Sequence, residues 1–148
     1  MFRKIVATSP YWFTIPIRLT LGAVMMGHGA QKVLGSFGGS GLEKFVSGTT
    51  PFGFMKPTWL WLGAAAVSEL VGGAIIVLGL LTRVGAFLVA CTMLTAVVGV
   101  HWGSFFSPRG MEYPLTLLGM SLALLISGGG MASVDLALSA GSSGRRRF

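Results

Sequence analysis

The sequence predicts an all-α integral membrane protein, built as a four-helix bundle with both termini in the cytoplasm. Of its 148 residues, 53% are hydrophobic and only 10% are charged, and a soluble domain of this size could not bury so much apolar surface. The apolar residues form long runs without a two-residue alternation, which excludes the strands of a membrane barrel and leaves helices. Most basic residues lie in segments that would share one side of the membrane if four helices cross it, which sets the orientation.

Four apolar runs are long enough to cross a bilayer. They occupy residues 15–34, 59–81, 84–100 and 113–129. Each has roughly the 17 to 25 residues that a helix needs to cross about 30 Å of hydrocarbon. Pro16 fits the first turn of the first helix, where a missing amide hydrogen costs nothing. Only Thr82 and Arg83 separate the second run from the third, so these two helices are predicted to be antiparallel neighbours.

The distribution of positive charge orients the helices. Basic residues gather at the amino terminus, in the turn between the second and third runs and in the carboxyl tail: Arg3, Lys4, Arg83, Arg145, Arg146 and Arg147. The other two loops clearly hold only Lys44, Lys56 and Arg109. Because cytoplasmic loops carry the excess of Lys and Arg, both termini are predicted to be cytoplasmic and the two longer loops external. The net charge of +7 has this explanation, so no nucleic-acid partner is expected.

The chain divides into three parts. Residues 1–14 are predicted to lie at the cytoplasmic interface, where Tyr11, Trp12 and Phe13 are favoured, and they lack the pattern of a removable signal peptide. Residues 15–138 form the transmembrane domain. Residues 139–148 form a basic cytoplasmic tail that anchors to anionic lipid. The external loop over residues 35–57 is rich in aromatic side chains and is expected to contain a short helix at residues 42–46.

Polar side chains at membrane depth predict a site. At about 1.5 Å per residue, His28 lies about 19 Å above the inner end of the first helix and Glu69 about 18 Å above that of the second. Four more polar groups lie about one turn further out or at the outer helix ends: Gln31, Lys32, His101 and Glu112. An ionised Glu69 would cost roughly 2.5 to 3.5 kcal/mol in hydrocarbon, so it is predicted to face inward and to pair with His28 or Lys32.

Small residues beside this pair would allow a close approach of the two helices. They are Gly27, Gly29, Gly72 and Gly73. The alternative is that the polar residues only fix helix pairing, as buried polar groups in membrane bundles often do. Arg18 lies near the inner end of the first helix, where it is either structural, extending its side chain to the interface, or part of the site.

Several chemistries are disfavoured by residue counts. A single cysteine, Cys91, excludes an internal disulfide or a dithiol pair. Two histidines and one cysteine do not make a zinc site, so no metal is expected. Haem ligation by His28 and His101 is a minor alternative, because their depths differ by about 6 Å. No phosphate-binding loop, nucleotide fingerprint or nucleophile elbow is present.

An ordered set of short motifs resembles DoxX-family membrane proteins. In order they are Arg18, residues 28–32 (HGAQK), residues 38–42 (GGSGL) leading to Phe45, residues 69–73 (ELVGG), residues 78–83 (LGLLTR), residues 101–102 (HW), residues 110–113 (GMEY) and residues 133–135 (SVD). The resemblance covers about residues 17–138. The chain departs from the family pattern in its Gly/Ser-rich first outer loop and its RRRF tail.

The resemblance implies a four-helix bundle in the cytoplasmic (inner) membrane of a prokaryote and a link with redox work. Related DoxD-like subunits are associated with thiosulfate:quinone oxidoreductase, and other DoxX members with oxidative-stress complexes. The family-like polar residues carried over by position are Arg18, His28, Gln31, Lys32, Glu69, His101 and Glu112.

Three functions are compatible with these residues. In the favoured one, the protein is a quinone-linked redox subunit. Glu69 and His28 then move protons, and a quinone carbonyl is bound by Arg18, Gln31, Lys32, His101 and Glu112. The chain has no electron carrier of its own, so whether it is an enzyme by itself is left open.

The alternative is a non-catalytic subunit that stabilises or assembles a larger complex, with Trp59 and Trp61 as docking surfaces. A solute or proton conduit is the third, and it would require several copies of the chain to enclose a pathway. Membrane lipid and either a second copy or other membrane subunits are the expected partners.

Overall fold

The computed structural model describes residues 6–106, 108 and 110–141, and within them the chain is all-helical, as predicted. The helices are α2 (Thr14–Val33), the 3₁₀ helix η1 (Ser36–Gly38), α3 (Leu42–Val46), α4 (Thr58–Leu78), α5 (Thr82–Thr95), the π-helix η2 (Ala96–Val100), α6 (Glu112–Ser127) and α7 (Val134–Gly141). The short helix predicted at residues 42–46 is confirmed by α3. The orientation prediction depends on several basic residues that lie outside the described residues. They are Arg3, Lys4, Arg109 and residues 145–147 of the tail.

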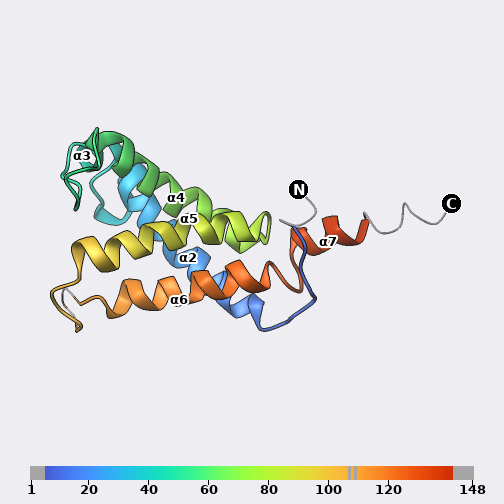
Figure 1. Cartoon of the computed structure of the whole chain (residues 1–148). Helices are drawn as coiled ribbons and strands as arrows, with labels where there is room; N and C mark the ends of the chain where they lie inside the picture. Colours follow the sequence, from blue (N-terminus) through green and yellow to red (C-terminus); the bar gives the residue numbers. More distant parts are fainter. Residues whose placement is uncertain (1–5, 107, 109, 142–148) are drawn as a thin grey trace.

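The long helices α2, α4, α5 and α6 lie alongside one another (Figure 1). Helix α2 packs mainly on α4, α4 also on α5, and α5 on α6, while α2 and α6 share a smaller contact. One end of the molecule carries α3 and the loop that leads into α6, and the other end carries the α4–α5 turn and α7 (Figure 1). These are called the α3 end and the α7 end below.

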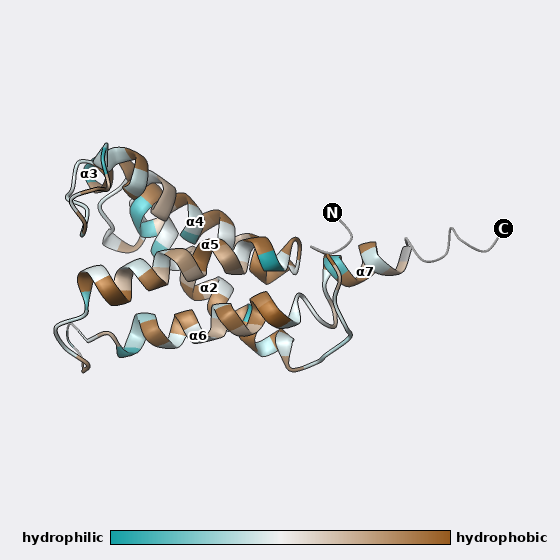
Figure 2. Cartoon of the chain, viewed as in Figure 1, coloured by the Kyte–Doolittle hydropathy of each residue, from teal (hydrophilic) through white to brown (hydrophobic). Residues whose placement is uncertain are grey.

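Two helices are long and apolar enough to cross a membrane: α4, and the continuous helix formed by α5 and η2 over Thr82–Val100. Only 28% and 33% of their most apolar stretches are buried within the chain, whereas a core helix of a soluble protein would be mostly buried. Figure 2 shows hydrophobic residues along both of them. The other two predicted spans do not meet the same criteria, because α2 contains Arg18, His28, Gln31 and Lys32 and α6 has only 16 residues.

The start of α5 differs slightly from the prediction. The helix begins at Thr82, so Arg83 belongs to its first turn and not to the connecting loop. The cause is Asp135, just after the start of α7, whose carboxylate accepts hydrogen bonds from the amides of Leu81 (2.7 Å) and Thr82 (2.9 Å). These amides would otherwise lack partners at a helix start, so a distant residue sets this boundary.

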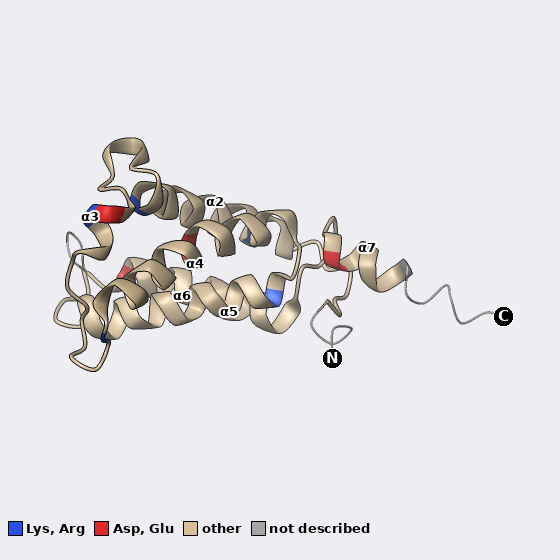
Figure 3. Cartoon of the chain, turned by 90° about the horizontal axis from the view of Figure 1, so that it is seen from above, with Lys and Arg blue, Asp and Glu red and all other residues tan. Residues whose placement is uncertain are grey.

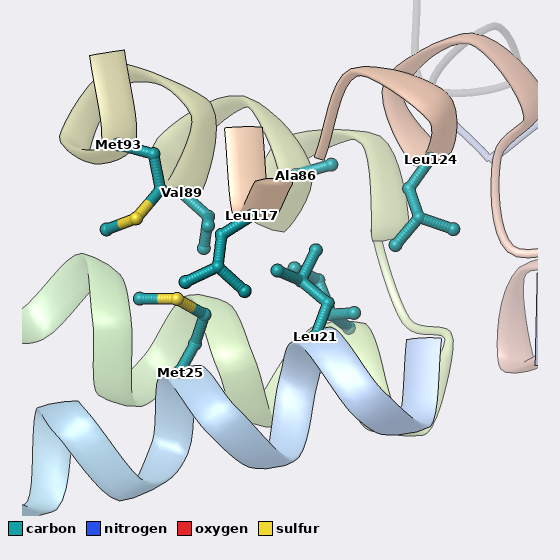
Figure 4. Packing of buried hydrophobic residues seen from close by; sticks show 8 residues of the cluster. Leu21, Met25, Ala86, Val89, Met93, Leu117 and Leu124 are labelled. Atoms are coloured by element: carbon teal, nitrogen blue, oxygen red, sulfur yellow. The ribbon is translucent and has the colours of Figure 1, made fainter. Parts of the chain in front are cut away.

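The core lies between the four long helices. Figure 4 shows side chains of α2, α5 and α6 meeting there, and the buried cluster consists of Leu21, Met25, Ile76, Ala86, Val89, Met93, Leu117 and Leu124. Such a core fixes which face of each helix points inward, and so determines where the polar residues of α2 and α4 lie.

Candidate functional site

The centre of the candidate site is an ion pair between α2 and α4. The Nζ atom of Lys32 lies 2.5 Å from both carboxylate oxygens of Glu69. Glu69 is 2% exposed and Lys32 is 27% exposed. Figure 3 shows how sparse charged residues are along the long helices, which makes this pair the more distinctive. Of the two partners expected for Glu69, the structure therefore provides Lys32.

Glycine brings the two helices close enough for this pair to form. A Cβ atom added to Gly29 would overlap the backbone of Leu70, and one added to Gly73 would lie 2.7 Å from the backbone nitrogen of Met26. The backbones of α2 and α4 are thus in direct contact next to the ion pair, on its α7-end side, as expected for small residues at a helix interface. The other two glycines expected to allow this close approach do not lie at the α2–α4 contact. A Cβ atom added to Gly27 would meet no atom within 4 Å, and Gly72 faces α5.

The loop after α2 covers the ion pair from the α3 end. The amide of Gly41 donates to the carbonyl of Gln31 at 3.2 Å, and the close contact of Gly39 with the Gln31 backbone leaves no room for a side chain there. This return of the chain positions α3, whose Phe45 ring has its centroid 5.2 Å from the Nζ atom of Lys32. The aromatic face adds a cation–π contact to the salt bridge.

His28 lies one turn before Lys32 on α2, but it contacts a different helix. Its Nε2 atom shares a 2.9 Å hydrogen bond with the hydroxyl of Tyr113 in α6, and the two rings meet edge to face. The pair borders a surface hollow of about 260 Å³, which Ala23, Val24, Gly27, His28, Gln31, Phe37 and Tyr113 line. We call it the α2–α6 hollow. The wall of this hollow is largely apolar, and His28 and Tyr113 are the protonatable groups in it.

The two pairs are separate but near each other. Within the described residues, His28 bonds to Tyr113 and not to Glu69, so the shared contact of His28 and Glu69 considered from the sequence does not form. The Glu69 carboxylate is close enough to the Tyr113 hydroxyl for the two groups to interact electrostatically. Helix α2 therefore carries two adjoining polar contacts, one towards α4 and the other towards α6.

Arg18 lies near the α7 end, ten residues or about 15 Å along α2 from His28. Its side chain is 4% exposed and so does not extend to the membrane surface. All five of its N–H groups donate to backbone carbonyls, at distances between 2.8 and 3.1 Å. The acceptors are Ile76 and Val77 at the end of α4 and Gly129, Met131 and Ala132 before α7. Arg18 thus joins the ends of three helices and is not brought to the other polar residues.

His101 and Glu112 lie at the two ends of the loop that leads into α6. His101 follows η2 and Glu112 begins α6, so both lie at the same end of the molecule as Lys32 (Figure 1). Among the described residues, no group of three or more His, Cys, Asp or Glu side chains could hold a metal ion.

Three residues with a role in the structure were not predicted as site residues from the sequence. Tyr113 completes the His28 contact, Phe45 covers Lys32, and Asp135 caps α5. Each of them stands in or beside a motif of the family resemblance, which was the available signal. Their partners lie on other helices, so spacing along the chain alone could not reveal the contacts.

Comparison with known proteins assigns the chain to a family. A family model described as DoxX matches residues 13–102, which include α2, α4, α5 and η2. The chain therefore belongs to the DoxX family of membrane proteins. Comparison with curated proteins and with solved structures gave no significant match. Tyr113 and Asp135 lie beyond the matched residues, whereas Arg18, His28, Gln31, Lys32 and Glu69 lie within them.

Proposed function

We propose that the protein is a quinone-linked redox subunit that binds a quinone head group in the α2–α6 hollow. The observation that carries the proposal is the His28–Tyr113 hydrogen bond in the wall of that hollow, beside Gln31. A quinone ring is flat and apolar except at its carbonyl oxygens, so it suits an apolar wall with a few hydrogen-bonding groups. Gly27 supports the proposal, since the space above it is open for a ring to lie against α2.

Reduction of a quinone to a quinol takes two electrons and two protons, and the protons form O–H bonds on the two ring oxygens. In the proposal, His28 and Tyr113 deliver these protons, because both carry exchangeable protons and are already hydrogen-bonded. Glu69, held by Lys32, contributes negative charge close to Tyr113. The electrons come from a partner protein or a diffusing reductant, since one cysteine cannot cycle as a dithiol.

We also propose that all four long helices cross the cytoplasmic membrane of a prokaryote, with both termini inside. The apolar character of α4 and of α5 with η2 supports this. Helices α2 and α6 pack beside them as neighbours of similar direction and span, and the Lys32–Glu69 pair neutralises the charge that α2 and α4 would carry into hydrocarbon. His101, Glu112 and the ion pair then lie towards the external face.

A matched pair of glycine substitutions tests the quinone site. Gly27→Leu fills the hollow, and Gly119→Leu adds the same side chain to α6, where an added Cβ likewise meets no atom within 4 Å. Binding of a soluble short-chain quinone is measured by equilibrium dialysis of the detergent-purified protein. We expect Gly27→Leu to weaken binding at least about tenfold, or about 1.4 kcal/mol, and Gly119→Leu to leave it unchanged. Equal binding by both variants would refute the site.

The alternative function is a non-catalytic subunit that assembles a larger complex. It is favoured by the exposure of Trp59 (60%) and Trp61 (44%) on α4, since Trp is enriched at binding hot spots. Trp59→Ala would then reduce co-purification of partner subunits while His28→Ala would have no effect on quinone turnover of the complex. The opposite pattern favours the redox role.

A further inference from the structure

A second cavity lies between α4 and α5. It has a volume of about 190 Å³ and is partly open to the surroundings. Its walls come from α4, from α5 and from the loop that precedes α4, and they are formed by Thr50, Pro51, Met55, Trp61, Leu62, Ala64, Ala65, Ser68, Leu88, Cys91, Thr92 and Thr95. None of these residues is charged, so the cavity differs in chemistry from the α2–α6 hollow.

The hydroxyl groups in this cavity are already bonded within the chain. Ser68 donates to the carbonyl of Ala64 at 2.6 Å, and Thr92 and Thr95 donate in the same way to carbonyls four residues earlier in α5. Thr50 donates to the carbonyls of its own loop. Because these protons are not available to a ligand, the cavity presents an apolar wall despite its hydroxyl-bearing residues.

The loop wall is built into the fold. Pro51 lies directly against Gly99 of η2, where an added Cβ atom would come within 2.7 Å of the proline ring, and Met55 is 8% exposed. The loop therefore closes the cavity at the α3 end, while its wall is exposed at Ala64 on α4 and Cys91 on α5. These two helices have a length and composition that suit a bilayer, so with the proposed membrane topology the opening faces hydrocarbon.

We propose that this cavity binds part of one acyl chain of a membrane phospholipid. Pockets for whole drug-sized molecules have roughly 300–1,000 Å³, so a cavity of about 190 Å³ accommodates a chain segment and not a head group. An uncharged wall whose hydroxyl protons are already bonded favours hydrocarbon over a charged ligand. The proposal does not depend on the quinone site, which involves α2 and α6.

Tryptophan fluorescence tests the proposal, because Trp61 lines the cavity and Trp59 does not. One protein keeps Trp61 alone, with Trp12, Trp59 and Trp102 replaced by Phe, and a matched protein keeps Trp59 alone. Each is titrated in detergent micelles with a phospholipid whose acyl chains are brominated, since bromine quenches tryptophan on contact. We expect quenching of Trp61 to saturate near one lipid per protein and quenching of Trp59 to rise in proportion to the lipid added.

Two variants of the Trp61 protein locate the bound chain. Cys91→Phe fills the cavity from α5, and Leu94→Phe places the same aromatic side chain on the exposed face of that helix. Saturable quenching should be lost in Cys91→Phe and kept in Leu94→Phe, and Ala64→Phe fills the cavity from α4 should Cys91→Phe not fold. Non-saturating quenching of Trp61, or saturable quenching that survives filling, would overturn the proposal.

Competition identifies the occupant. An unbrominated phospholipid in excess should restore Trp61 fluorescence, as expected for an acyl-chain site. If a polyisoprenoid alcohol restores it and the phospholipid does not, the cavity holds an isoprenoid chain and the proposed occupant is wrong.

Discussion

The ammonium group of Lys32 lies 2.5 Å from both carboxylate oxygens of Glu69, although the two residues belong to different helices and are 37 positions apart. Glu69 is almost completely buried while Lys32 retains partial exposure. The pair is therefore asymmetric. The lysine can reach a polar surface if its partner is removed, whereas the carboxylate cannot.

This asymmetry gives the first prediction. Lys32→Met leaves an unpaired buried carboxylate and should destabilise the protein by about 3–5 kcal/mol, whereas Glu69→Gln should cost clearly less. The double variant Lys32→Met with Glu69→Leu should regain most of the loss, because an apolar pair removes both charges. Thermal unfolding in mild detergent measures all three. Single and double variants of equal stability would contradict a direct pair.

The His28–Tyr113 contact should matter for ligand binding more than for folding. Removing one net hydrogen bond costs about 0.5–1.5 kcal/mol, and both residues are partly exposed, so His28→Ala and Tyr113→Phe are expected near the lower limit. Quinone affinity should fall in both, and the double variant should lose less than the sum because the residues act together. Tyr11→Phe, far from the hollow, is the control. Additive losses of quinone affinity would show that the two residues act independently.

Arg18 is predicted to act on stability and not on quinone binding. Lysine has three N–H donors in place of a planar set of five, so Arg18→Lys cannot serve the carbonyls of both α4 and the segment before α7. Its unfolding free energy should fall by at least about 2 kcal/mol. The remaining folded protein should bind quinone like the parent. A stable Arg18→Lys protein that no longer binds quinone would instead make Arg18 part of the ligand site.

Asp135 should control the start of α5. Asp135→Ala removes the acceptor for the amides of Leu81 and Thr82, a loss comparable to removing a helix cap at about 0.5–2 kcal/mol. Amide hydrogen exchange should accelerate at these two positions and remain unchanged at the other end of α5. Asp135→Asn, which keeps one acceptor oxygen, should lie between the parent and Asp135→Ala.

The proposed topology predicts which ends of the helices are accessible from each side. In a Cys91→Ala background, a single cysteine at Ser47 in the loop after α3 should react with a membrane-impermeant maleimide on intact cells. A cysteine at Ala140 in α7 should react only after permeabilisation. Labelling of both positions on intact cells would rule out the predicted orientation of the α7 end.

The residues of the ion pair could be predicted from the sequence because helix geometry fixes depth. A rise of 1.5 Å per residue put His28 level with Glu69 and Lys32 about one turn further out, and the need to neutralise Glu69 left these two as possible partners. The choice between them depends on which side of α2 meets which helix. Gly29 and Gly73 decide this by bringing α2 against α4, and that packing is a tertiary property that spacing does not contain.

The α7 end was less predictable for the same reason. Arg18 was placed correctly near the end of its helix, but its acceptors are main-chain carbonyls of distant segments, which any residue type could supply. Asp135 resembled an ordinary polar residue after the last apolar run, since nothing in the local sequence shows that its carboxylate receives two amides from the α4–α5 turn.

The sequence distance between Arg18 and Gly129 is 111 residues, which has a consequence for biosynthesis. A ribosome finishes α2 long before it makes the carbonyls before α7 that the guanidinium needs, so this cation must stay hydrated or be shielded by the insertion machinery until that segment has been made. Reporter fusions that end the chain before residue 129 would trap that unfinished state, and those joined after α7 would not.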